Sequence, residues 1–229
     1  MKDISVKALA KINLGLDVVR KREDGYHEVR MVMQTIHLFD RLEISKNTSG
    51  EITMETNLSF LPTNENNLVY KAAKLLQDEF AIKDGVHVWL HKYIPVAAGM
   101  AGGSTDAAAV LYGMNQIFDL GLTREELMER GVKIGADVPY CIMRGTALAE
   151  GIGEKLSKLP PMVKCPVLIA KPQISVSTKF VYENLKLGSD MVHPDIDRLV
   201  ADIREKDLRE LQRKKLLQQH FQHQFRQSS

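Results

Sequence analysis

Residues 95–111 read Pro95-Val-Ala-Ala-Gly-Met-Ala-Gly-Gly-Ser-Thr-Asp106-Ala-Ala-Ala-Val-Leu111, so a glycine-rich run leads directly into an alanine-rich helical pattern. Its three glycines are free to adopt positive φ, which would let successive backbone N–H groups converge on an anion. Ser104 or Thr105 is expected to cap the following helix, whose N-terminus offers N–H groups to the same anion. The stretch therefore predicts a phosphate-binding loop. The alternative is a turn that lets a helix of small residues pack closely on a sheet.

A second polar pattern lies near the N-terminus, where Lys11 and Asn13 occur in a strand-like stretch. Alternation along a strand places these two side chains on one face and the intervening apolar residues on the other. The turn that follows, around Asp24-Gly25, ends in Tyr26 and His27, which brings an aromatic ring next to an imidazole. A solvated lysine, a satisfied strand amide and a surface histidine are the alternatives for these residues.

Asp137 forms the third pattern, in the run Gly135-Ala-Asp137-Val-Pro139 that follows a predicted helix. Thr123 and Glu126 have the spacing of a capping box at the start of that helix. Gly135 and Pro139 lie on either side of Asp137, and rigid backbone there would aim its carboxylate at a ligand. An N-cap or turn aspartate is the alternative.

The three patterns occur in a fixed order: Lys-Ile-Asn-Leu with Gly-Tyr-His, then Pro-x-Ala-Ala-Gly-x-Ala-Gly-Gly-Ser-x-Asp-Ala-Ala, then Gly-Ala-Asp-Val-Pro. This set resembles the galactokinase, homoserine kinase, mevalonate kinase and phosphomevalonate kinase (GHMP) superfamily. The resemblance extends from about Lys7 to about Lys206. It implies an α+β protein with a two-lobed GHMP-kinase fold. Residues 1–160 would form a ribosomal-protein-S5-domain-2-like, ATP-binding lobe, and residues 161–208 the start of an incomplete ferredoxin-like lobe.

The resemblance further implies an ATP-dependent small-molecule kinase in which Lys11 and Asp137 form the catalytic pair. Asp137 would take the proton from the acceptor hydroxyl and Lys11 would neutralise developing charge, and phosphoryl transfer needs little more covalent chemistry from a protein. Mg²⁺ would accompany ATP, with Ser104 as its protein contact. The ATP phosphates would lie along Pro95, Val96, Ala97, Ala98, Gly99, Met100, Ala101, Gly102, Gly103, Ser104 and Thr105.

The combination of Lys-Ile-Asn-Leu, Asp-Gly-Tyr-His and a later Gly-Thr-Ala-Leu-Ala-x-Gly-x-Gly-Glu is similar to superfamily kinases whose substrate carries cytidine diphosphate. Asn13 would then bind the substrate near its reacting hydroxyl. Tyr26 and Tyr182 would stack on the cytosine, and His27 would hydrogen-bond its edge. A core position is the alternative for Tyr182, because it lies in a helical pattern. A homoserine- or mevalonate-type kinase and a non-catalytic nucleotide binder are the alternative functions.

Composition narrows the class of protein. The net charge of +2 over 229 residues is too small to predict nucleic-acid binding. Cys141 and Cys165 have neither metal-ligand spacing nor the density of a disulfide scaffold, so both are expected to be reduced thiols. No signal peptide or long apolar span occurs. We therefore expect a cytoplasmic enzyme, a monomer or weak homodimer, that binds a small-molecule substrate but neither nucleic acid nor a membrane.

Strands are predicted over 4–9, 11–19, 29–37, 41–46, 51–55, 86–91 and 146–149, and helices over 66–80, 104–117, 123–134 and 177–186. This order indicates an α+β fold rather than a doubly wound parallel sheet. Pro166-Val-Leu-Ile-Ala170 is expected to be a buried strand. From Arg209 the sequence becomes basic and glutamine-rich and departs from the family, without its Gly-Ser-Gly-Pro motif. Residues 209–229 are therefore predicted to be an atypical tail, and the activity of this chain to be weak or absent.

Overall fold

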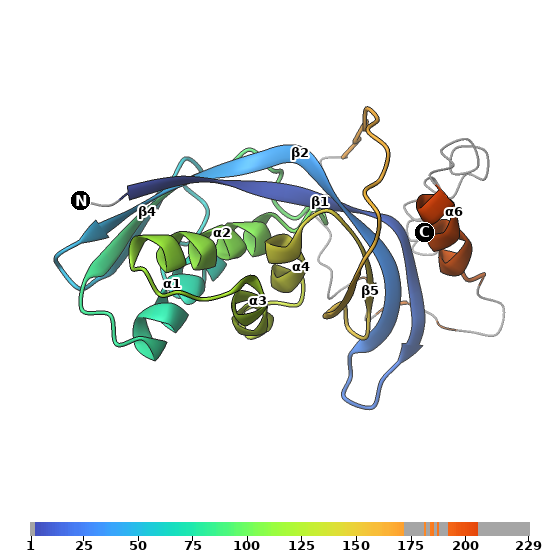
Figure 1. Ribbon diagram of the computed structural model, residues 1–229, viewed down its shortest axis with the longest axis horizontal. Coiled ribbons are helices and arrows are strands. Elements are labelled where there is room, and N and C mark those ends of the chain that lie inside the picture. The colour runs from blue at the N-terminus through green and yellow to red at the C-terminus, as the bar shows by residue number, and fades with distance from the viewer. Residues whose placement is uncertain (1–2, 172–180, 182–183, 186, 188–191, 206–229) are drawn as a thin grey trace. The chain divides into compact units, whose positions relative to one another are not determined.

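The computed structural model describes residues 3–171, 181, 184–185, 187 and 192–205 (Figure 1). The chain divides into two compact units. The first comprises residues up to Lys11, Ile36–Val96 and Met100–Met143, and the second comprises Ile12–Thr35, Ala97–Gly99 and the residues from Arg144 onward. Two long strands, β1 (Asp3–Lys21) and β2 (His27–Asn47), contribute residues to both units.

The sheet of the first unit follows the order β3-β4-β2, with β1 paired to β2. Strand β4 (Gly85–His91) lies antiparallel to β2 and parallel to β3 (Ile52–Thr56). The parallel pair is joined by α1 (Leu68–Glu79), because parallel neighbours need a crossover connection. Along β4, Val86, Val88 and Leu90 are buried while the residues between them are half-buried. One face of this sheet therefore carries the core.

Helix α2 (Gly102–Ile117) is packed against three other helices of the first unit, namely α1, α3 (Arg124–Val132) and α4 (Val138–Met143) (Figure 1). Ala107, Ala108 and Ala109 of α2 are buried. A Cβ added at Gly113 would overlap the Ile44 side chain of β2, so the helix approaches the strand closely. Close packing of a small-residue helix on a sheet, one of the two interpretations of residues 95–111, is therefore confirmed.

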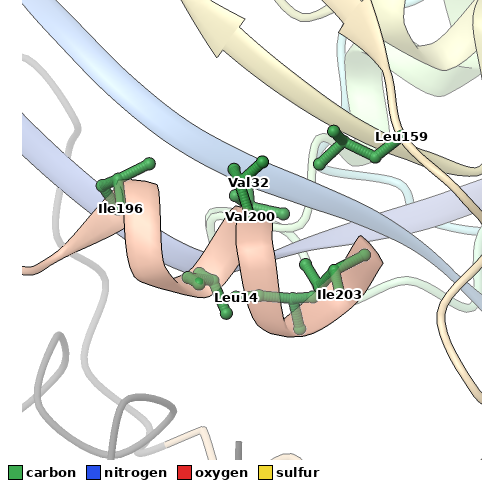
Figure 2. Close-up of a cluster of buried hydrophobic side chains, with 7 residues drawn as sticks. Leu14, Val32, Leu159, Ile196, Val200 and Ile203 are labelled. Carbon is green, nitrogen blue, oxygen red and sulfur yellow. The ribbon is translucent and has the colours of Figure 1, made fainter. Parts of the chain in front are cut away.

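The second unit has its own hydrophobic core. Strand β5 (Thr146–Glu150) lies antiparallel to β2 and to β6 (Lys155–Lys158). Helix α6 (Ile196–Glu205) supplies four of the seven buried residues of the cluster, at the spacing i, i+3, i+4, i+7 of a single helix face. Figure 2 shows these side chains beside those of β1 and β2. The cluster consists of Leu14, Val32, Leu159, Ile196, Leu199, Val200 and Ile203.

The α+β fold class is confirmed, and most predicted elements exist. Asn67 caps α1 by accepting a hydrogen bond from the Val69 N–H at 2.9 Å. The predicted capping box of Thr123 and Glu126 begins α3. The predicted strands 4–9 and 11–19 form one continuous strand, as do 29–37 and 41–46, because β1 and β2 pair with each other.

The predicted strand at Pro166–Ala170 was wrong. Val167, Leu168 and Ile169 are exposed, and none of the described strands pairs with this segment. A strand-forming sequence without a neighbouring strand lacks partners for its backbone N–H and C=O groups. Helices α4 and α6 and strand β6 were not predicted. Most of the predicted helix 177–186, including Tyr182, lies outside the described residues.

No helix in the described part of the chain is both long enough and apolar enough to cross a membrane. The predicted boundary between lobes at Pro160-Pro161 falls within the second unit and stays a prediction.

Candidate active site

The predicted catalytic pair is assembled within the first unit. Lys11 Nζ lies 3.5 Å from Asp137 Oδ2, which makes the two side chains an ion pair. The Lys11 side chain is 6% exposed, whereas that of Asp137 is 31% exposed. A buried cation thus accompanies a carboxylate that solvent reaches. A carboxylate that solvent reaches can also be reached by a bound hydroxyl group, as the predicted role of Asp137 as a base requires.

The backbone fixes both members of the pair. The Lys11 N–H donates to the Met100 carbonyl at 3.2 Å, which ties β1 to the residues just before α2. The Asp137 carbonyl accepts a hydrogen bond from the Cys141 N–H at 3.0 Å and so begins α4. Pro139 is the second residue of α4, where the missing N–H of proline removes no helical hydrogen bond. The backbone of Asp137 thus begins α4, while its side chain forms the ion pair with Lys11.

The N-terminus of α2 differs from the prediction. The helix begins at Gly102, and its N-cap residue Ala101 makes no side-chain capping hydrogen bond. Ser104 and Thr105 lie in the first turn, so the prediction that one of them caps the helix was wrong. The Thr105 hydroxyl instead donates to the Leu9 carbonyl at 2.9 Å and joins α2 to β1. The Thr105 N–H donates to the Ala101 carbonyl at 2.8 Å, and the Ala101 side chain offers no acceptor to the N–H groups before it, which suits an anion site.

Positive φ in the glycine-rich run occurs at one glycine and at two alanines. Of the three glycines that are free to adopt positive φ, Gly99 does so, at +68°, whereas Gly102 and Gly103 do not. Ala97 and Ala101 take positive φ instead, at 54° and 55°. Alanine rarely adopts this conformation, and strain of this kind tends to occur at functional sites.

Ser104 and Cys141 also lie near the Lys11–Asp137 pair or the segment that carries it. A Cβ placed on Gly135 would lie 4.0 Å from the Ser104 hydroxyl, so the first turn of α2 adjoins the segment before Asp137. The Cys141 thiol is buried, and burial raises its pKa, with a further increase from the negative charge of Asp137. Cys141 is therefore a protonated, structural thiol rather than a nucleophile.

Three of the predicted substrate-binding residues, Asn13, Tyr26 and His27, belong to the second unit. Tyr26 is 61% exposed at the tip of the hairpin between β1 and β2. The predicted turn is confirmed, since Gly25 has a φ of +84° and the Tyr26 N–H donates to Asp24 Oδ1 at 3.1 Å. Asn13 and His27 are half-buried. The ring of Tyr26 is thus open to a stacking partner, and the roles of Asn13 and His27 stay predictions.

Sequence reasoning missed Asp40 and Lys92, which form a buried cluster with Asp106 beside the start of α2. Neither residue lies in a motif. An aspartate within the apolar pattern of β2 was the one available signal, because an ionisable residue in a buried strand needs a partner.

Comparison with known proteins assigns the family. A family model described as the GHMP kinases N terminal domain matches residues 67–145. A 4-diphosphocytidyl-2-C-methyl-D-erythritol kinase from Lachnoclostridium phytofermentans is 60% identical over 208 residues, which cover 91% of this chain and 72% of that relative. The chain belongs to the 4-diphosphocytidyl-2-C-methyl-D-erythritol kinase family. A member from Caldicellulosiruptor bescii is 50% identical over 91% of this chain and 73% of its own length.

Solved structures support the same assignment. A crystal structure of a 4-(cytidine 5'-diphospho)-2C-methyl-D-erythritol kinase matches with a TM-score of 0.73 and 31% identity, over 88% of this chain and 72% of that one. A homoserine kinase from Cytophaga hutchinsonii matches with a TM-score of 0.69 but only 19% identity, over 96% of this chain and 73% of that one, and so shows the shared fold alone. The expected GHMP-kinase fold is confirmed.

Proposed function

We propose that this chain transfers the γ-phosphoryl group of ATP to the 2-hydroxyl group of 4-diphosphocytidyl-2-C-methyl-D-erythritol, a step of the non-mevalonate isoprenoid pathway. Membership of the kinase family supports this substrate. The observation that carries the chemistry is the Lys11–Asp137 ion pair, at 3.5 Å, in the same unit as the N-terminus of α2.

Residues of the first unit can supply the proton transfer, the charge neutralisation and the phosphate binding that the reaction needs. Asp137 accepts the proton of the 2-hydroxyl group as its oxygen attacks the γ-phosphorus, and ADP leaves with the electrons of the broken P–O bond. Lys11 offsets the negative charge that develops next to the carboxylate. The first-turn N–H groups of α2 hydrogen-bond the phosphate oxygens of ATP.

Magnesium fits this site only as an ion held mainly by ATP. Among the described residues, no group of three or more His, Cys, Asp and Glu side chains is arranged to hold a metal ion. Mg²⁺ keeps several waters and takes phosphate oxygens readily, so one hydroxyl from the protein is a sufficient contact. We assign that contact to Ser104 in the first turn of α2. The ion would neutralise charge on the transferred phosphoryl group.

We propose further that the enzyme acts in the cytoplasm. Neither Cys141 nor Cys165 forms a disulfide, which suits a reducing compartment. A monomer or weak homodimer would suffice, because the proposed catalytic pair comes from a single chain.

The substitution Asp137→Asn tests the proposed base. Asparagine keeps the size of the side chain but cannot accept the proton, so kcat should fall about 10²- to 10⁴-fold in a coupled assay of ADP release. Asp78→Asn on the exposed face of α1 is the matched control and should leave turnover unchanged. Circular dichroism would verify that both variants fold. Unchanged turnover in Asp137→Asn would refute the assignment of Asp137 as the base.

The substitution Tyr26→Ala tests the proposed pyrimidine contact. Loss of the exposed ring should weaken the binding of cytidine diphosphate by about 1–3 kcal/mol in isothermal titration calorimetry, because a stacked base contributes that much. Tyr26→Phe should retain the affinity, since the ring remains. Tyr112→Ala, which removes another exposed tyrosine, is the control and should bind normally. Equal affinity of Tyr26→Ala and the wild type would remove Tyr26 from the site.

A further inference from the structure

Three ionisable side chains form a buried cluster in the first unit, and none of them belongs to the catalytic pair. The Lys92 ammonium contacts Asp40 Oδ2 and lies 2.7 Å from Asp106 Oδ2. The three side chains are 4%, 0% and 3% exposed, in that order. We call Asp40, Lys92 and Asp106 the ionic brace.

The ionic brace joins the two ends of the glycine-rich run. Asp40 Oδ1 accepts hydrogen bonds from the Tyr93 N–H at 2.5 Å and the Ile94 N–H at 2.8 Å, just before the run begins at Pro95. Asp106 lies in α2, where the run ends. Lys92 bridges the two carboxyl groups. One cation therefore connects the backbone that leads into the run with the helix that leaves it.

The ammonium group also lies close to the start of α2. A Cβ built on Gly102, the first residue of the helix, would lie only 3.1 Å from Lys92 Nζ and 3.4 Å from Ile94 Cγ2. A side chain at Gly102 would therefore press on the brace. Because the contact is so close, a shift of Lys92 would be transmitted directly to the helix N-terminus whose N–H groups are proposed to bind phosphate.

A cluster of this kind contributes little net stability, because burying charges is costly and a well-packed apolar cluster is often as stable. Asp106 Oδ1 has no hydrogen-bond partner within the described residues, which is a further cost. Burial raises the pKa of Asp106 to about 8, and the positive charge of Lys92 partly opposes this rise.

From these contacts we infer that Asp40, Lys92 and Asp106 are positioning residues that hold the glycine-rich run and the N-terminus of α2 in the geometry that binds the ATP phosphates. This inference rests on the proposed function of the site. The brace thus acts on the ATP site, whereas Lys11 and Asp137 act on the acceptor hydroxyl group.

The substitution Lys92→Met tests the inference through the two substrates. Its KM for Mg-ATP should rise about 10- to 100-fold, because a misplacement of about 1 Å has effects of that size, while its KM for the cytidine substrate stays near the wild-type value. Calorimetry with Mg-ATP should show the same loss of affinity without turnover. Lys74→Met, which breaks the exposed Lys74–Asp78 pair of α1, is the control and should change neither KM.

A second variant guards against misfolding, because Lys92→Met leaves the buried Asp40 charge unpaired. Asp40→Asn with Lys92→Met removes one cation and one anion together, keeps a side-chain oxygen for the Tyr93 and Ile94 N–H groups, and should show the same selective loss of Mg-ATP affinity.

The results of these experiments distinguish failure of the positioning role from failure of the proposed function. Normal Mg-ATP affinity in the folded variants, or equal increases in both KM values, would overturn the positioning role, and so would unfolding of both variants. A wild-type chain that fails to bind Mg-ATP would overturn the proposed function, and the inference with it.

Discussion

The carboxyl group of Asp106 links the pH of the solution to the stability of the first unit. The pKa of this group rises from 3.8 to about 8 because the side chain is buried, with a contribution from the charge of Asp40, and Lys92 partly opposes the rise. Between these two values the folded chain holds a proton that the unfolded chain has lost. The contribution of Asp106 to stability is therefore fully present below pH 3.8 and decreases as the pH rises through about 8.

Asp106→Asn should remove this dependence. Relative to the variant, the wild-type free energy of unfolding should fall by up to about 1.4 kcal/mol per pH unit between pH 5 and pH 8 and then level off. Urea denaturation at each pH measures the difference, with Lys92, Asp40 and Cys141 unchanged as the other titratable neighbours. A constant difference between the two proteins over that range would mean that Asp106 is ionised in the folded chain.

Some residues of the site could be predicted from the sequence, and others could not. The family resemblance implied that Lys11 and Asp137 form a pair; the structure places their charged groups 3.5 Å apart, and their catalytic role stays a prediction. The brace was not predicted, since Asp40, Lys92 and Asp106 are separated by 52 and 14 residues and only the folded chain brings them together. Positive φ occurs at Ala97 and Ala101 as well as at Gly99, whereas a Cβ on Gly102 would lie 3.1 Å from Lys92 Nζ, so Gly102 is favoured by close packing rather than by its φ.

Among the helices, those with strong end signals were predicted well. The capping box of Thr123 and Glu126 marked the start of α3, and the helix predicted over 66–80 is close to the bounds of α1. Helix α4 was missed because it has six residues and includes Pro139. Helix α6 could have been found, since Ile196, Leu199, Val200 and Ile203 have helical spacing. The strand predicted at Pro166–Ala170 was wrong, because strand propensity alone supplies no partner strand.

The capping box of α3 gives a prediction at this scale. The Thr123 hydroxyl accepts a hydrogen bond from the Glu126 N–H at 3.2 Å, and Glu126 Oε2 accepts one from the Thr123 N–H at 2.8 Å. Thr123→Ala should lower the free energy of unfolding by about 0.5–2 kcal/mol in urea denaturation. Thr123→Ser keeps the hydroxyl and should be close to the wild type. A loss of the same size in the serine variant would show that the methyl group, not the cap, matters.

For the molecule as a whole, the segment around Leu168 carries apolar side chains that face solvent. Leu168 is 97% exposed, and Val167 and Ile169 are 48% and 41% exposed. Adjacent exposed apolar residues favour association, because contact between two such patches removes apolar surface from water. Self-association of the chain is therefore expected to depend on this segment.

Leu168→Lys tests this expectation. The wild type should show a mass that increases with concentration in sedimentation equilibrium, and the variant should show a smaller increase. Thr63→Lys adds the same charge at another exposed position and should associate as the wild type does. Equal association of all three proteins would place the contact elsewhere.

Strand β1 runs without interruption from Asp3 to Lys21 and carries Lys11 and Asn13 two positions apart. Side chains alternate along a strand, so the gain or loss of one residue would turn every later side chain to the opposite face. A gene that encodes this strand can accept changes of residue type far more readily than changes of length. Differences in length among descendants of this sequence should therefore collect in the exposed connections, such as the one between β3 and α1, and spare β1.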